Sequence, residues 1–142
     1  MDQHGYGYTI TTPLGQAEAI EAVSTALKSE GFGVLTSIDA QATLKQKLGV
    51  EMPAYMILGA CNPPLAHRAL SAEPEIGLLL PCNVVVYANA AGGTTISAID
   101  PIAQFALVRR ADLAELAEDV AARLRRVLAQ VEVAVASAER PS

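Results

Sequence analysis

The chain has 142 residues, of which 51% are hydrophobic, 18% are charged and 4% are aromatic, and its formal net charge is −5. This length fits one domain over residues 1–142, with one core at about residues 6–135, and the acidic balance excludes nucleic acid as a general partner, because a phosphate backbone needs a concentrated positive surface. No apolar run reaches the ~18 residues of a membrane-spanning helix, so the sequence predicts a protein that does not cross a membrane. No signal peptide is visible, which predicts a cytoplasmic protein, with export followed by removal of the signal as the alternative.

Periodicity in the first half of the chain predicts three strands and two helices. Residues 6–11 alternate as a half-buried strand does. After Pro13 the apolar residues recur at intervals of three and four up to Gly31, which indicates an amphipathic helix. Asp39 is placed to cap a shorter helix. We expect strands at 6–11, 32–38 and 54–61 and helices at 13–30 and 39–48, after a mobile tail that contains His4.

Prolines divide the second half of the chain. Asn62 before Pro63 is the pattern of an N-cap and a first helical residue, because an N–H at that first position would have no partner within the helix. Pro81 interrupts an apolar run, so a strand has to restart at Cys82. We expect a helix at 63–72, a short strand at 76–80, a hairpin of strands at 83–88 and 94–99, a helical turn after Asp100-Pro101, and a long helix at 112–138.

This order of elements is typical of a mixed α/β domain, most simply a two-layer arrangement in which helices cover a sheet. Three motifs in the same chain resemble the domain of unknown function 302 family, over about Tyr6 to Val131. The motifs are Gly59-Ala60-Cys61-Asn62-Pro63-Pro64-Leu65-Ala66, Ile76-Gly77-Leu78-Leu79-Leu80-Pro81-Cys82-Asn83-Val84-Val85-Val86 and Ala98-Ile99-Asp100-Pro101. The resemblance implies an α+β two-layer sandwich with a mostly antiparallel sheet, helices packed on one face and a homodimeric state, and it implies no settled activity.

Both cysteines belong to Cys-Asn pairs that lie beside proline. Cys61 comes at a strand end just before a helix start, where a thiolate is stabilised by the helix dipole and by free N–H groups. If the chain returns so that Cys82 lies nearby, the two thiolates and His67 form a soft ligand set for Cu(I) or Zn(II). Three alternatives stay open: each cysteine fills the core as a small hydrophobic residue, Cys61 acts as a redox or sulfur-transferring nucleophile, or the two form a disulfide.

The two asparagines also have two interpretations. Asn62 and Asn83 are suited to capping backbone N–H groups at chain reversals. Alternatively their amides, together with Arg68 and the helix N–H groups that begin near Leu65, bind a small anion or polar ligand. No serine or histidine is placed to complete a hydrolytic triad with Asp100.

These patterns predict a dimeric binding or accessory module with a ligand or metal site at the two Cys-Asn motifs. The residues expected at this site are Cys61, Asn62, Pro63, Arg68, Cys82 and Asn83, with His67 as a further metal ligand. A thiol-based redox or sulfur-transfer enzyme that uses Cys61 is the main alternative. A purely structural role for the motifs, in turns and dimer packing, is the third.

Overall fold

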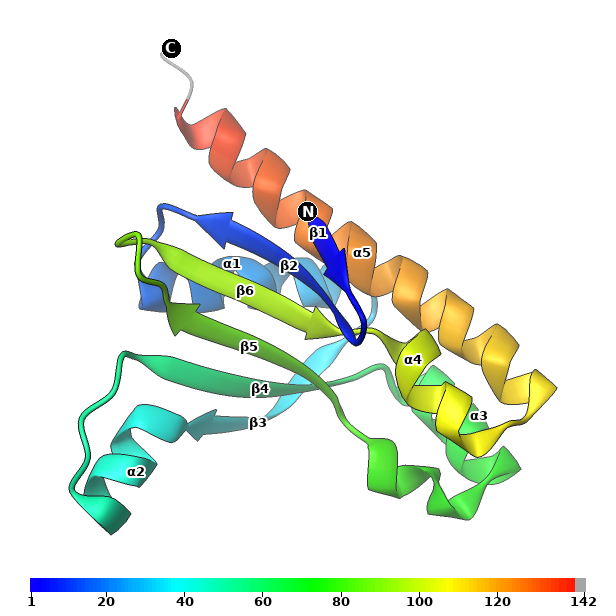
Figure 1. Ribbon diagram of the computed structural model, residues 1–142. Helices are drawn as coiled ribbons and strands as arrows, with labels where there is room; N and C mark the ends of the chain where they lie inside the picture. Colours follow the sequence, from blue (N-terminus) through cyan, green and yellow to red (C-terminus); the bar gives the residue numbers. More distant parts are fainter. Residues whose placement is uncertain (140–142) are drawn as a thin grey trace.

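Six antiparallel strands form one sheet in the computed structural model, which describes residues 1–139 (Figure 1). The strand order across the sheet is β1-β2-β6-β5-β4-β3, so β1 and β3 are the two edges. The strands are β1 (Asp2–His4), β2 (Gly7–Thr12), β3 (Gly33–Asp39), β4 (Tyr55–Cys61), β5 (Cys82–Ala88) and β6 (Thr94–Ile99). All neighbouring pairs are antiparallel.

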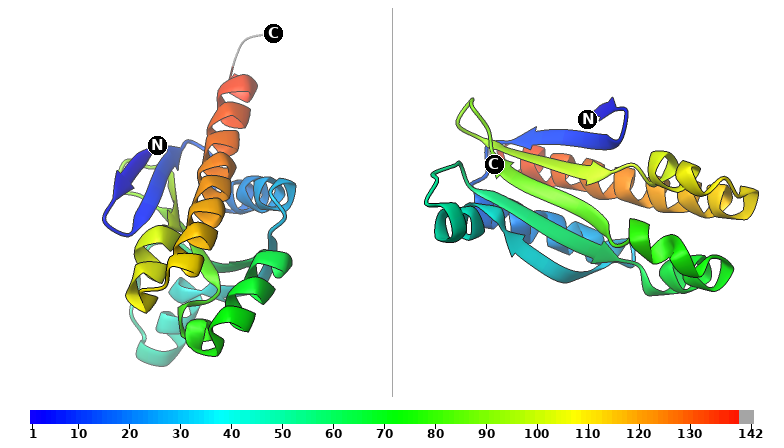
Figure 2. Two further views of the ribbon diagram at one scale, coloured as in Figure 1. Left: turned by 90° about the vertical axis from the view of Figure 1, so that its right-hand side faces the viewer. Right: turned by 60° about the horizontal axis from the view of Figure 1, so that its bottom comes forward.

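Two long helices cover one face of this sheet and pack against each other (Figure 2). They are α1 (Gln16–Ser29) and α5 (Ala111–Glu139). The core between the layers is built from aliphatic side chains, among them Val23 and Leu27 of α1, Leu124 and Leu128 of α5, and Val84, Val86 and Ile96 of the sheet, each at most 1% exposed. The α+β sandwich with an antiparallel sheet, predicted from the sequence, is therefore confirmed.

The shorter helical segments lie at the two ends of the sheet (Figure 1). Helix α2 (Ala40–Leu48) follows β3 at one end. At the other end lie α3 (Pro63–Ala72), the 3-10 helix η1 (Pro74–Leu79), α4 (Pro101–Phe105) and the 3-10 turn η2 (Ala106–Val108). No helix within residues 1–139 combines the length and the apolarity that crossing a bilayer demands.

The structure corrects two of the predicted elements. The segment predicted as a strand at 76–80 is part of η1, because the carboxylate of Glu73 accepts a hydrogen bond from the N–H of Glu75 and Pro74 opens the helical turn. The segment predicted as a mobile tail is β1, which returns along β2 after a turn at Gly5-Tyr6 and pairs Gln3 with Tyr8. Strand β5 begins at Cys82, directly after Pro81, as the sequence predicted.

Candidate functional site: an apolar cavity between the two Cys-Asn motifs

The register of the sheet brings the two cysteines together. Cys61 is the last residue of β4 and Cys82 is the first residue of β5. Ala60 and Cys82 are direct partners across these two strands, so Cys61 is one residue beyond the partner of Cys82. Both cysteines are free, and both line the same cavity. The convergence of the two motifs, which the sequence left open, is therefore present in the fold.

This cavity has a volume of ≈ 330 Å³ and lies between the β3–β4–β5 end of the sheet and the helical segments α3, η1 and α5. Buried apolar residues form its inner wall: Phe32, Ala60, Leu65, Ala69, Phe105, Leu116 and Val120. Leu35 of β3 and Leu70 of α3, which are 67% and 42% exposed, stand at its mouth. No lining residue carries a charged side chain. The volume falls in the range of small-molecule sites, and the lining is more apolar than such sites usually are.

The polar side chains of the lining are few, and the amide of Asn62 is already engaged. Its Oδ1 accepts a hydrogen bond from the N–H of Leu65 (3.4 Å), and its Nδ2 donates to the carbonyl of Glu30 (3.3 Å). The guanidinium of Arg123 donates to the same carbonyl (3.1 Å). Asn62 therefore caps α3, as predicted, and also ties the start of α3 to the end of α1. The other polar side-chain groups of the lining are the Thr36 hydroxyl and the two thiols.

The amino terminus of α3 has no free N–H group for an anion or a thiolate. Pro63 and Pro64 have no N–H. The N–H of Leu65 is bonded to the Asn62 side chain, and the N–H of Ala66 is bonded to the Asn62 carbonyl (2.8 Å). The physical basis for an anion site at this helix start, and for an activated thiolate that depends on its N–H groups, is therefore missing.

Burial keeps Cys82 in its thiol form. Its side chain is 6% exposed, and loss of hydration, followed by repulsion from Cys61, raises the pKa of Cys82 from 9.0 to about 11. An apolar environment disfavours the charged form because no solvent dipoles stabilise it. At neutral pH, Cys82 therefore contributes a small, weakly polar surface to the cavity rather than an anion.

Four of the predicted site residues do not line this cavity. His67 and Arg68 are exposed on α3 and line a separate surface hollow with Asp112. Asn83 is exposed and faces the uncovered side of the sheet. Pro63 is the first residue of α3 and is itself exposed. Within residues 1–139, His, Cys, Asp and Glu form no cluster of three that could hold a metal ion, so the predicted set of Cys61, Cys82 and His67 is not assembled.

The helical period of α3 explains where these side chains lie. Leu65 and Ala69 are buried and one turn apart, so they define the inner face of the helix. At 100° per residue, His67 is about 200° from Leu65 and points outward. The spacing of Leu65 and Ala69 in the sequence was therefore sufficient to predict that His67 points outward. The wall residues Phe32, Phe105, Leu116 and Val120 come from three distant segments, and sequence reasoning did not assign them to the site.

A glycine sets how closely β3 approaches the turn before β5. A Cβ atom at Gly59 would lie 2.8 Å from Cγ of Pro81 and closer still to Oγ1 of Thr36, both of which belong to cavity-lining residues. Because Gly59 pairs with Thr36 on one side and with Asn83 on the other, it lies between the two strands at the cavity edge. The absence of a side chain here permits the close packing of this edge.

The fold and the cavity define a two-layer α+β protein with an apolar cavity, open to solvent on one side, at one end of its sheet. The chain matches the family described as Domain of unknown function DUF302 over residues 8–131, and it belongs to that family. It is similar to the crystal structure of an uncharacterized conserved protein DUF302 from Bacillus stearothermophilus, with 34% sequence identity and a TM-score of 0.82, over 88% of this chain and 97% of that one. A comparison with curated proteins found no match.

Proposed function

We propose that this chain is a binding module and that its ligand is a small, uncharged, mainly hydrocarbon molecule held in the cavity between the two Cys-Asn motifs. The observation that carries this proposal is the lining: ≈ 330 Å³ of space without a charged side chain. A charged ligand would lose its hydration there and find no partner, which makes its burial costly. A hydrocarbon ligand would gain about 0.8 kcal/mol for each methylene group removed from water.

The volume limits the size of the ligand. A water-sized group takes up about 30 Å³ in a liquid, so a cavity of ≈ 330 Å³ holds roughly eleven non-hydrogen atoms. 1-Decanol has this size and is neutral. Decanoate has the same chain length and carries a negative charge, so the two compounds separate the effect of charge from that of chain length.

Isothermal titration calorimetry of the wild-type protein with these two compounds tests the proposal. We expect 1-decanol to bind with one site per chain and decanoate to bind at least about tenfold more weakly, because its carboxylate has no partner in the cavity. The absence of any saturable binding of 1-decanol, or equal affinity for decanoate, would contradict the proposal.

A matched pair of variants places the binding in the cavity. Ala66 lines the cavity, whereas the next residue, His67, is on the outer side of α3. Ala66→Leu adds apolar volume inside the cavity and should weaken 1-decanol binding about tenfold or more, because the added side chain occupies the ligand's space. His67→Leu adds a leucine outside it and should leave the affinity unchanged. Equal effects of the two substitutions would exclude this cavity as the site.

The thiol and metal functions stay predictions. Cys61 is half-buried in the wall of the cavity, where it could contact a ligand. A redox or sulfur-transfer role for Cys61, and binding of Cu or Zn by the two thiols, rest on the pairing of the cysteines alone. The binding of an uncharged ligand has the support of the whole lining, so we favour it.

A further inference from the structure

The segment that contains β3 and α2 has no buried side chain. Residues 33–50 are all exposed or half-buried, whereas Phe32, directly before them, is 3% exposed. We call residues 33–50 the β3–α2 arm. Segments with few buried side chains and with solvent-exposed backbone hydrogen bonds open locally at a lower free energy than the core does. The arm is therefore a part of the fold in which local opening is expected.

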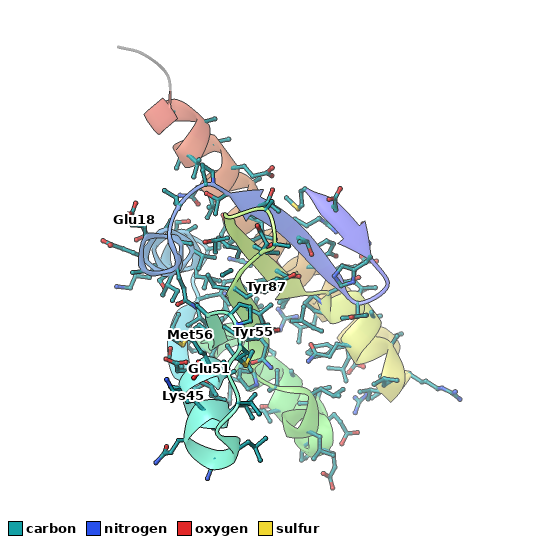
Figure 3. The ribbon with its side chains drawn as sticks, turned by 60° about the vertical axis from the view of Figure 1, so that its left-hand side comes forward. Glu18, Lys45, Glu51, Tyr55, Met56 and Tyr87 are labelled. Atoms are coloured by element: carbon teal, nitrogen blue, oxygen red, sulfur yellow. The ribbon has the colours of Figure 1, made fainter. Side chains whose placement is uncertain are left out.

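The arm is attached to the sheet along one edge. β3 is an edge strand and pairs with β4 alone. The side-chain contacts of α2 are made with the loop before β4: Gln41 donates to the carbonyl of Met52 (2.8 Å), and Lys45 forms an ion pair with Glu51 (3.2 Å; Figure 3). These contacts join α2 to chain that follows it directly. The β3–β4 ladder is therefore the main attachment of the arm to the sheet.

A β-bulge interrupts this ladder at the mouth of the cavity. Val34 pairs with Ala60 and Thr36 pairs with Gly59, so Leu35 has no partner of its own on β4. Leu35 is 67% exposed and, like Thr36, lines the cavity. A bulge disrupts the hydrogen-bond ladder locally, and bulges are frequent beside functional sites. A weak point in the attachment of the arm therefore coincides with the mouth of the cavity.

The other side of β4 is anchored more firmly. Leu58 and Ala60 of β4 are each 1% exposed and belong to the core. At the start of the strand, Tyr55 stacks on Tyr87 of β5, with ring centroids 5.2 Å apart and planes inclined by 9° (Figure 3). Such aromatic pairs add to the stability that burial alone provides. We therefore expect strand separation between β3 and β4 rather than between β4 and β5.

We propose that the β3–α2 arm is the movable wall of the cavity, and that a ligand enters and leaves while β3 is separated from β4 near the bulge. The inference rests on the proposed function, because it requires a cavity that takes up a ligand. Leu35 and Thr36 complete the wall only while the arm is attached, so a bound ligand favours the attached state. Lids over binding sites generally come from the least stable parts of a fold.

Hydrogen exchange of individual amides, followed by NMR with and without 1-decanol, tests the arm in the wild-type protein. In the free protein, the β3 amides that bond to β4 should exchange faster than the amides of β5 and β6. If the arm opens only without ligand, 1-decanol at about ten times its Kd should slow exchange in β3 about tenfold. β1 is the control, because this opposite edge strand is also exposed and does not line the cavity, and its exchange should not change.

A matched pair of glycine substitutions changes the opening itself. Gly33 begins β3, and an added Cβ there would meet no atom within 4 Å, so Gly33→Ala fits the attached arm. Alanine has fewer conformations than glycine in the open arm, so exchange in β3 and dissociation of 1-decanol, measured by NMR exchange spectroscopy, should both slow by about two- to fivefold. Gly15→Ala, at a glycine with equally open surroundings before α1, should leave both rates unchanged.

The inference and the proposed function fail in different ways. Exchange in β3 that is as slow as in β5 in the free protein would overturn the inference. Unchanged exchange in β3 at a concentration at which calorimetry shows bound 1-decanol would also overturn it, as would wild-type rates of exchange and dissociation in Gly33→Ala. In these cases the cavity remains a binding site with a rigid wall. Failure of 1-decanol to bind at all would instead contradict the proposed function, and the inference with it.

Discussion

Ionisation of Cys82 should lower the stability of the fold at alkaline pH. Its pKa is about 11 in the folded chain and 9.0 when unperturbed. Because the folded-state value is the higher one, the contribution of Cys82 to stability is fully present below about pH 9 and is lost as the pH rises to about 11. We expect the difference in free energy of unfolding between the wild type and Cys82→Ala to shrink by about 2 kcal/mol between about pH 8 and about pH 11.

Urea unfolding of both proteins across this pH range measures the effect. Other groups with shifted pKa values, such as Tyr8, are present in both proteins and cancel in the difference. A difference that stays constant with pH would show that the Cys82 thiol ionises as easily in the folded chain as in the unfolded chain.

Asn62 has two structural tasks, and its replacement should expose both. Asn62→Ala removes the cap on the N–H of Leu65 and the bond to the Glu30 carbonyl. We expect a loss of about 1–3 kcal/mol in the free energy of unfolding, measured by urea denaturation, from the lost cap and the lost buried hydrogen bond. The other Cys-Asn pair provides the control: Asn83 is exposed, and Asn83→Ala should change stability by less than about 0.5 kcal/mol. Equal losses in the two variants would mean that the motifs share one structural role.

At the scale of elements, Asp100 joins the sheet to two helices. Its Oδ1 accepts hydrogen bonds from the Tyr8 hydroxyl of β2 (2.9 Å) and from the N–H of Ile102 in α4 (3.0 Å). Arg125 of α5 donates to the same hydroxyl (3.3 Å), and its guanidinium carbon is 5.6 Å from the centroid of the Tyr8 ring. Burial and then the bond to Asp100 raise the pKa of Tyr8. The carboxylate therefore connects β2, α4 and, through Tyr8, α5.

Asp100→Ala should destabilise the chain by about 2–4 kcal/mol, because it removes a helix cap and leaves the Tyr8 hydroxyl without its buried acceptor. Thermal and urea unfolding measure the loss. Asp112→Ala is the control, since this exposed aspartate pairs with Arg110 at the surface and its removal should matter much less. A loss for Asp100→Ala no larger than that for Asp112→Ala would contradict the role assigned to this carboxylate.

Local patterns predicted most of the elements, and the two errors have different physical causes. Caps and prolines mark the starts of α2, α3 and α4 in the sequence, and the structure has these caps at Asp39, Asn62 and Asp100. An apolar run as short as 76–80 is compatible with a strand and with a helical turn. In the structure the Glu73 side chain caps the first turn of η1, which favours the helical turn. Strand β1 consists of Asp2, Gln3 and His4, which are exposed and have no apolar periodicity. Only its pairing with β2 in the structure identifies it as a strand.

At the scale of the whole molecule, the sequence predicted the location of the candidate site but not the apolar cavity that the structure shows there. The Cys-Asn motifs predicted a meeting point of two chain reversals, and the sheet register establishes it by pairing Ala60 with Cys82. The cavity depends on side chains from β3, α3, η1, α4 and α5, whose packing together is a property of the tertiary fold. His67, Arg68 and Asn83 were expected at the site because they are close to the cysteines in the sequence. In the structure, the helical period turns His67 and Arg68 outward on α3, and the alternation of β5 places Asn83 on the uncovered face of the sheet.

The bare backbone at Gly59 limits how this family member can diverge. Apolar residues of the cavity wall can exchange for others of similar volume, one substitution at a time, and thereby alter the shape of the cavity. Position 59 has no such freedom, because any side chain there would push against Pro81 and Thr36. Inherited variation should therefore reshape the interior of the cavity more readily than the edge formed by β3 and the turn before β5.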